Sequence, residues 1–238
     1  MKVLSTESPK LQVSHRKTSQ KRVYVEIKKA IVNGTIGFDT RLSEESIAKL
    51  FGVSRTPIRE AIFQLAQEGL VTKKDNSHFY VRRPTEEELD EIAEVRIVLQ
   101  NILIDKLIDK SDDRLVEELE QNVERSKKFL AADDTRSLNY ALSDFHEILY
   151  SASKSFCIGK ILKEMVDLVL LNRAIAMKYK GIRSLLVSDH EKIMNAIKQG
   201  NRTEAKKRMR EHILNTKKKA LEALLRDKLN AIVEESIK

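Results

Sequence analysis

Residues 42–61 read LSEESIAKLFGVSRTPIREA, and this stretch decides the fold of the first third of the chain. Ser43 followed by two acidic residues is typical of a capped helix N-terminus, and Gly52 marks the end of that helix. A second helix begins at Ser54 or Thr56, with a proline in its first turn, where backbone amides have no helical partner. The stretch therefore predicts two short helices joined by a tight turn.

The apolar residues of these two helices indicate which faces are buried. We expect Ile47, Leu50 and Phe51 to form the inner face of the first helix. The second helix carries apolar residues at helical spacing, namely Ile58, Ala61, Ile62 and Leu65. Arg55 and Arg59 lie four residues apart and therefore share the opposite, exposed face near the start of this helix.

Another helix is expected upstream of this pair. Apolar residues recur at helical spacing from Val23 to Ile31, and Asn33-Gly34 then provides a signal for the end of a helix. Residues 1–19 lack a sustained apolar period, so we expect them to form a disordered tail.

Two short strands are expected downstream. The β-prone runs at residues 70–72 and 79–81 enclose a polar stretch, and Asp75-Asn76 is the expected turn between them. Three helices followed by a hairpin predict a winged helix-turn-helix domain over residues 20–83.

The net charge of the chain is concentrated in this predicted domain. Residues 1–83 carry 16 Lys and Arg against 8 Asp and Glu, whereas the remaining residues carry 28 of each sign. The net charge of +8 therefore lies entirely in the first third. A basic module beside a neutral one is the charge pattern of a nucleic-acid-binding protein with a second task.

The start of the second helix of the pair carries the residue types that read DNA. In a helix-turn-helix this end enters the major groove, where an arginine such as Arg55 or Arg59 can bind O6 and N7 of guanine. Ser54 and Thr56 are placed to bond a phosphate or a base edge. With two positions in the wing, the candidate DNA-binding residues are Ser54, Arg55, Thr56, Arg59, Lys73 and Asn76.

The rest of the chain, residues 84–238, is helical in period throughout, which makes the protein mainly α. The predicted helices cover residues 86–109, 112–131, 134–151, 155–179, 182–199 and 202–235. The single cysteine, Cys157, is expected to be a buried structural residue and is consistent with a reducing cytoplasm. No apolar run is long enough to cross a membrane, and the N-terminus lacks the apolar stretch of a secretory signal.

Three histidines on separate predicted helices tend toward the interior of this helical part. His146, His190 and His212 each share a helix face with apolar residues. Neutral imidazoles that converge inside a helical bundle are typical ligands of zinc, nickel or a similar ion. A single inward histidine is more often a hydrogen-bonded core residue, and the spacing alone leaves the two interpretations equally open.

The N-terminal residues resemble a known family. The run GVSRTPIREAI at residues 52–62, and the continuation EGLV at residues 68–71, resemble the DNA-binding domain of the GntR family. The resemblance implies that Arg55 and Arg59 read bases and that the protein binds a palindromic operator as a homodimer. The wing tip lacks the family's usual glycine, and Asn76 can supply the positive φ in its place.

The C-terminal part resembles the FCD domain of the FadR-like branch of that family. The resemblance rests on the segments around Glu94-Val95-Arg96, Phe145-His146 and His190 to Ile197, and on His212. It implies a helical domain that binds a small-molecule effector, with the family's cavity arginine at Arg96. A salt bridge between the two domains is an equally open role for Arg96.

In metal-binding members of that branch, three histidines are joined by an acidic ligand one turn before the first of them. Leu142 occupies that position here, and Asp144 lies about 200° around the helix from His146. Asn139 shares the face of His146 two turns away and is a candidate effector contact together with Arg96. Two alternatives follow: a three-histidine metal site with open positions for the effector, or histidines that bind the effector directly.

We therefore expect a cytoplasmic transcriptional regulator, most simply a repressor, that binds double-stranded DNA as a homodimer and responds to a small carboxylate. A metal-dependent enzyme is a remote alternative, because no general base, nucleophile or glycine-rich phosphate loop accompanies the histidines. An architectural basic protein without a ligand is opposed by the neutral helical half. The sequence predicts no enzymatic activity.

Overall fold

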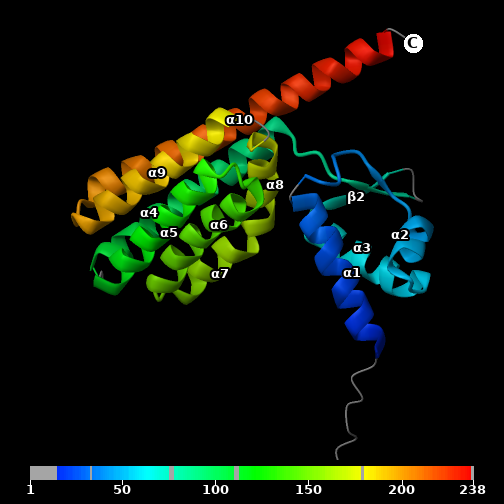
Figure 1. Cartoon of the computed structure of the whole chain (residues 1–238), viewed down its shortest axis with the longest axis horizontal. Helices are drawn as coiled ribbons and strands as arrows, with labels where there is room; N and C mark the ends of the chain where they lie inside the picture. The colour runs from blue at the N-terminus through cyan, green and yellow to red at the C-terminus, as the bar shows by residue number, and fades with distance from the viewer. Residues whose placement is uncertain (1–14, 33, 75–77, 110–112, 178–179, 237–238) are drawn as a thin grey trace, which may run out of the picture. The chain divides into compact units, whose positions relative to one another are not determined.

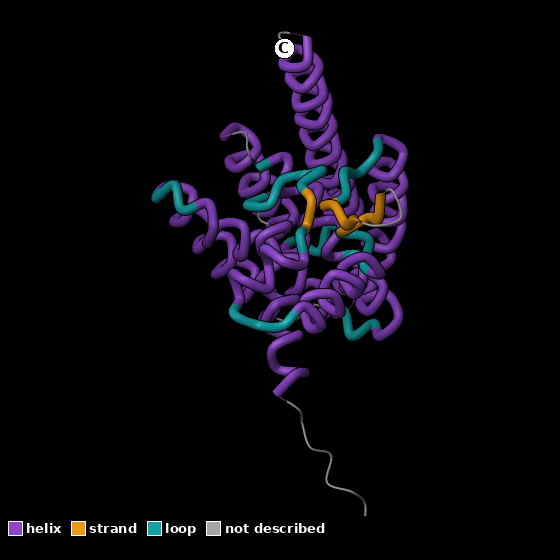
Figure 2. Tube along the Cα trace, turned by 90° about the vertical axis from the view of Figure 1, so that its right-hand side faces the viewer, coloured by secondary structure: helices purple, strands orange, loops and turns teal. Residues whose placement is uncertain are grey.

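The computed structural model describes residues 15–32, 34–74, 78–109, 113–177 and 180–236. The chain forms two compact units (Figure 1), and the main segment of the second unit begins at Arg83. Across the described residues, strands occur in the first unit and helices in both (Figure 2). The expected fold class, a winged helix-turn-helix followed by a helical bundle, is confirmed.

The first unit contains three helices and a small sheet. Its elements are α1 (His15–Val32), β1 (Arg41–Leu42), α2 (Glu44–Phe51), α3 (Arg55–Gln67), β2 (Val71–Lys74) and β3 (His78–Val81). Helix α1 begins at His15, whereas the sequence placed the end of a disordered tail at residue 19.

The sheet has one strand more than the predicted hairpin. Its order is β1-β3-β2, and both pairings are antiparallel. Strand β1 is too short to be seen in a sequence pattern, and pairing places its Leu42 opposite Phe79. The expected turn residues Asp75 and Asn76 lie outside the described residues.

Helices α2 and α3 follow the predicted caps. The Ser43 side chain accepts a hydrogen bond from the backbone N–H of Ser46, and Gly52 ends α2 with a left-handed φ of 65°. The expected inner face of α2 was wrong at Leu50, which is 81% exposed. Ala48 is the buried residue of α2, and Leu50 lies about 200° around the helix from it.

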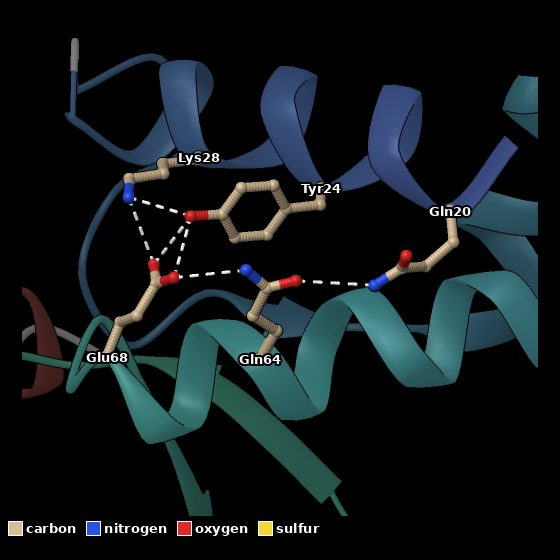
Figure 3. Close-up of polar contacts among 5 residues, drawn as sticks. All are labelled: Gln20, Tyr24, Lys28, Gln64 and Glu68. Carbon is tan, nitrogen blue, oxygen red and sulfur yellow. Dashed lines mark hydrogen bonds and ion pairs between the residues drawn. The ribbon is translucent and has the colours of Figure 1, made fainter. Parts of the chain in front are cut away.

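A polar network joins α1 to α3 and to Glu68 at its C-terminal end (Figure 3). The Tyr24 hydroxyl donates to the carboxylate of Glu68 at 2.7 Å, and Lys28 forms an ion pair with the same carboxylate at 3.1 Å. Gln64 donates to Glu68, and Gln20 donates to Gln64, each at 3.3 Å. These bonds hold α3 in register against α1, which the apolar pattern alone does not determine.

The second unit is made of seven helices in its described residues. They are α4 (Glu86–Asp109), α5 (Asp113–Ala131), α6 (Thr135–Ala152), α7 (Phe156–Glu164), α8 (Val166–Ala176), α9 (Lys180–Lys198) and α10 (Arg202–Ser236). The expected single helix over residues 155–179 was wrong, because the chain turns at Met165 between α7 and α8. The sequence has no glycine or proline there, so tertiary packing sets this break.

The position of Cys157 also corrects an expectation. It lies in the first turn of α7, which buries Gly159 and Leu162, and its own side chain is exposed. Helix α10 runs beyond the ends of its neighbours at its C-terminal half (Figure 1). None of the described helices is both long enough and apolar enough to span a bilayer.

Candidate functional site

The start of α3 presents its basic residues to solvent, as the sequence predicted. The side chains of Arg55 and Arg59 are 66% and 64% exposed, while Ile58 and Ile62 on the other face are fully buried. Thr56 is also exposed.

Glu44 and Glu45 of α2 contact these arginines. The sequence pattern predicted these residues only as favourable charges at a helix start. Arg55 forms an ion pair with Glu45 at 3.2 Å, and Arg59 lies 4.0 Å from Glu44. The Arg59 guanidinium also lies over the ring of Phe63, 5.6 Å from its centroid. Exposed ion pairs are worth about 0–1 kcal/mol, so these contacts hold the arginine side chains only weakly.

The remaining predicted DNA contacts are Ser54, at the start of α3, and Lys73 and Asn76, in the predicted wing. Ser54 is the N-cap residue of α3, but its side chain makes no capping hydrogen bond. Lys73 is exposed on β2, beside the exposed Lys74, which pairs with Asp39 at 2.9 Å. Asn76 lies outside the described residues.

The three histidines of the second unit converge, as their helical spacing predicted. His146 on α6, His190 on α9 and His212 on α10 are at most 5% exposed. One ligating atom from each lies within 4.8 Å of those of the other two. Both ring nitrogens of His190, and Nδ1 of the other two, are buried without a hydrogen-bond partner among the described residues. These nitrogens are available to a metal ion or to another ligand.

The residue one turn before His146 adds no ligand. Leu142 is fully buried, and Asp144 is bonded elsewhere, to Asn122 and Arg125. The carboxylate nearest the cluster is that of Asp189, 3.8 Å from Nδ1 of His212. At this distance it attracts the imidazole without a hydrogen bond.

Burial keeps the histidines neutral. It lowers the pKa of His146 and of His190 well below the ordinary value, and neighbouring histidines and arginines lower both further. Burial also lowers the pKa of His212, opposed in part by Asp189. Neutral imidazole is the form that binds metal ions.

Two arginines lie buried near this cluster. Arg96 on α4 was a predicted effector contact, whereas Arg173 on α8 was missed; each is only 5% exposed. Burial, followed by the charge of Arg96, lowers the pKa of Arg173 to about 9, so the guanidinium remains charged at neutral pH. A cation within the apolar run LVLLNRAIA, residues 168–176, was the signal that could have identified it.

Among the described residues, the two arginines have polar partners but no acidic ones. Arg173 donates to the backbone carbonyl of Asn139 at 3.2 Å and to the hydroxyl of Ser143. Burial lowers the pKa of Arg96, and the phenol of Tyr150, which accepts a hydrogen bond from Gln100 at 3.2 Å, partly opposes this shift. Neither arginine forms an ion pair within the described part of the chain, so positive charge is buried here uncompensated.

The neutral histidines make the stability of the metal-free protein depend on pH. Below about pH 6.5 the unfolded chain binds protons that the folded histidines refuse, so the free energy of unfolding falls as the pH falls. Each fully excluded proton costs about 1.4 kcal/mol at one pH unit below 6.5.

We expect His190→Gln to reduce the loss of stability between pH 7.5 and pH 5.5, measured by urea unfolding in the presence of a chelator. Leu50→Gln, which changes an exposed residue that does not titrate, should leave the slope unchanged. An unchanged slope in the His190 variant would contradict the assignment of buried neutral histidines.

Known proteins with similar sequences bear on both units. The family described as "Bacterial regulatory proteins, gntR family" matches residues 19–81, and the FCD domain matches residues 91–215. An uncharacterized HTH-type transcriptional regulator of Bacillus subtilis, YdhC, is 30% identical over 191 residues, covering 79% of this chain and 85% of that protein. The gluconate operon transcriptional repressor of Bacillus subtilis is 31% identical over 187 residues, 76% of each chain.

A solved structure shares the fold. A GntR regulator from Rhodococcus sp. RHA1 has a TM-score of 0.73 at 22% identity, covering 87% of this chain and 99% of that one. The two domain matches together account for most of the chain, in the order that the two units have in the structure. The chain therefore belongs to the GntR family of DNA-binding transcriptional regulators, in the branch that carries an FCD domain.

Proposed function

We propose that this regulator is a repressor that binds a palindromic operator as a homodimer and responds to a small carboxylate bound in its helical unit. The observation that carries the ligand class is the uncompensated charge of Arg96 and Arg173 beside three neutral histidines. The repressor assignment draws support from a relative, the gluconate operon transcriptional repressor. That name also makes sugar acids the first carboxylates to test.

The proposed DNA contacts rest on the exposed start of α3. Arg55 and Arg59 are held by weak surface ion pairs that guanine edges or phosphates can replace at little cost. Ser54 and Thr56 at the same helix end suit phosphate oxygens, because the N-terminal N–H groups and the helix dipole favour negative charge there. Lys73 and Asn76 of the wing complete the proposed set.

In the proposed effector site, a bound carboxylate would compensate the buried charges of two arginines. A buried cation without a partner costs several kcal/mol, and a carboxylate between Arg96 and Arg173 would recover much of that cost. Arginine presents a planar pair of donors that matches the two oxygens of a carboxylate. Asn139, whose backbone carbonyl already binds Arg173, lies at the edge of this proposed site.

The histidines fit a divalent transition metal such as zinc or nickel. Nitrogen ligands about 2.1 Å from one zinc ion lie at most about 4.2 Å apart, so small ring rotations would close the observed spacing. Three protein ligands leave a position open for water or for an effector carboxylate. Leu142 supplies no fourth ligand, which keeps that position open. The alternative is that the effector bonds the orphaned imidazole nitrogens directly.

A route from effector to DNA begins at α4. This helix carries Arg96 and starts at Glu86, four residues after Arg82, the last residue of the DNA-binding unit. A ligand that repositions Arg96 therefore acts on the helix nearest in sequence to that unit. Coupling requires that the ligand bind one arrangement of the two units better than the other.

Arg55→Ala and Arg59→Ala should each weaken operator binding at least tenfold, because each removes a base contact worth about 1–3 kcal/mol from both half-sites of the dimer. Duplexes selected from a random pool by the wild-type protein provide the operator, and gel shifts at fixed salt provide the affinity. Lys29→Ala, which removes an exposed charge from α1, is the matched control and should have a small effect. Intact affinity in both arginine variants would show that α3 does not read the groove.

Carboxylates should raise the melting temperature of the wild-type protein by roughly 5–10 °C at one hundred times Kd. Gluconate, malate and citrate are the probes, and glucose is the uncharged control. Arg173→Met should abolish the shift without lowering the starting melting temperature, because it removes an uncompensated buried charge. A shift that persists in both Arg173→Met and Arg96→Met would place the carboxylate elsewhere.

Protein loaded with zinc or nickel and then desalted should retain about one ion per chain by mass spectrometry of the metal, if three histidines hold it. His146→Ala and His190→Ala should each lose that ion, while His78→Ala keeps it. Stoichiometric metal in both cluster variants would exclude the three-histidine site. Carboxylate binding by a wild-type protein that retains no metal would favour direct contact with the imidazoles.

A further inference from the structure

Helix α4 exposes a stripe of apolar side chains that the proposed effector site does not use. Val95, Val98 and Ile102 are 44%, 59% and 42% exposed, and Leu99 between them is partly buried. Their spacing places them on one face of the helix, while the opposite face contributes Leu103, Ile104 and Leu107 to the core. Clustered exposed apolar residues of this kind mark an interaction surface more often than scattered single ones do.

Opposite charges end this stripe. Glu91 lies one turn before Val95, and Lys106 lies one turn after Ile102, on the same face. Both side chains are exposed, and neither forms an ion pair with any residue that the structure describes. The stripe is therefore an apolar centre with an acid at one end and a base at the other.

The stripe is symmetric about its own midpoint, between Val98 and Leu99. Val95 and Ile102 are equally far from that point, and so are Glu91 and Lys106. A second copy of α4 laid antiparallel across the first would therefore place apolar side chains against apolar ones. The same arrangement places each glutamate near the partner's lysine, as a two-fold interface requires.

A recess beside the stripe can receive a partner side chain. It lies between α4 and α10 and is lined by Glu94, Ile97, Val98, Arg210 and Leu214. An isologous interface needs both a projection and a recess on the same surface, and this surface has the two side by side.

We infer that the α4 stripe is the surface through which two copies of this chain pair, with the two α4 helices antiparallel across a two-fold axis. The inference rests on the proposed homodimer and specifies its interface. It explains why apolar side chains stay exposed in one chain and why Glu91 and Lys106 have no ion-pair partner among the residues described for that chain. A second copy of the chain matches both the symmetry and the charges of the stripe.

Charge reversal tests the antiparallel arrangement. Glu91→Lys and Lys106→Glu should each weaken the dimer roughly three- to tenfold, because each sets like charges opposite one another twice per dimer. A mixture of the two single variants should regain wild-type affinity, since each then meets an opposite charge, and so should the double variant. The measurement is sedimentation velocity of the full chain over a concentration series.

Val98→Glu places two carboxylates at the apolar centre and should weaken the dimer by roughly 100-fold or more. Leu225→Glu, at a residue of α10 that is 56% exposed, is the matched control and should leave the affinity unchanged. Circular dichroism checks that each variant is folded, which the exposure of these sites favours.

Three results would overturn the inference: a monomeric wild-type chain, an unchanged dimer in folded Val98→Glu, or single charge variants that mixing does not rescue. A monomeric wild type would point instead to a different partner on the stripe. Because sedimentation uses no DNA or effector, failure here is distinct from failure of the proposed operator binding, which the Arg55 and Arg59 variants test.

Discussion

Burial of cationic and imidazole side chains in an apolar interior is the constraint on which the helical unit depends. Desolvation holds the three histidines neutral and leaves the charges of Arg96 and Arg173 without an acidic partner among the described residues. In the function that we propose, an anion or a metal ion would bind these groups and offset the cost of burying them. The proposed response to a carboxylate follows from this imbalance.

The DNA-binding unit, in contrast, keeps its arginines at the start of α3 exposed rather than buried. The arginines that we propose as DNA contacts, Arg55 and Arg59, are exposed to solvent and form only weak ion pairs with α2, which a DNA ligand could replace. Rigidity is supplied behind them, by the apolar core and by the network in which Glu68 accepts bonds from Tyr24 and Lys28 (Figure 3). A fixed helix that carries adjustable side chains suits the reading of base edges.

Helix α4 carries both the buried Arg96 and the exposed apolar stripe of the second unit. One of its faces buries Arg96, and another exposes the stripe that we assign to dimer formation. The helix also follows the DNA-binding unit directly in sequence. If α4 moves when the effector binds, both the proposed dimer interface and the start of the connection to the DNA-binding unit move with it. The spacing of the two DNA-binding units in a dimer would then change, and with it their fit to a palindromic operator.

Elements with strong local signals could be predicted from the sequence. Ser43, Gly52 and the apolar period predicted α2 and α3, and helical spacing predicted the inward histidines, because capping and periodicity act over a few residues. Tertiary structure alone decided the break at Met165, the exposure of Leu50 and Cys157, and strand β1. It also decided that Arg173 lies near the histidine cluster. These features depend on contacts between segments far apart in the chain, and no local pattern encodes which partner each segment will meet.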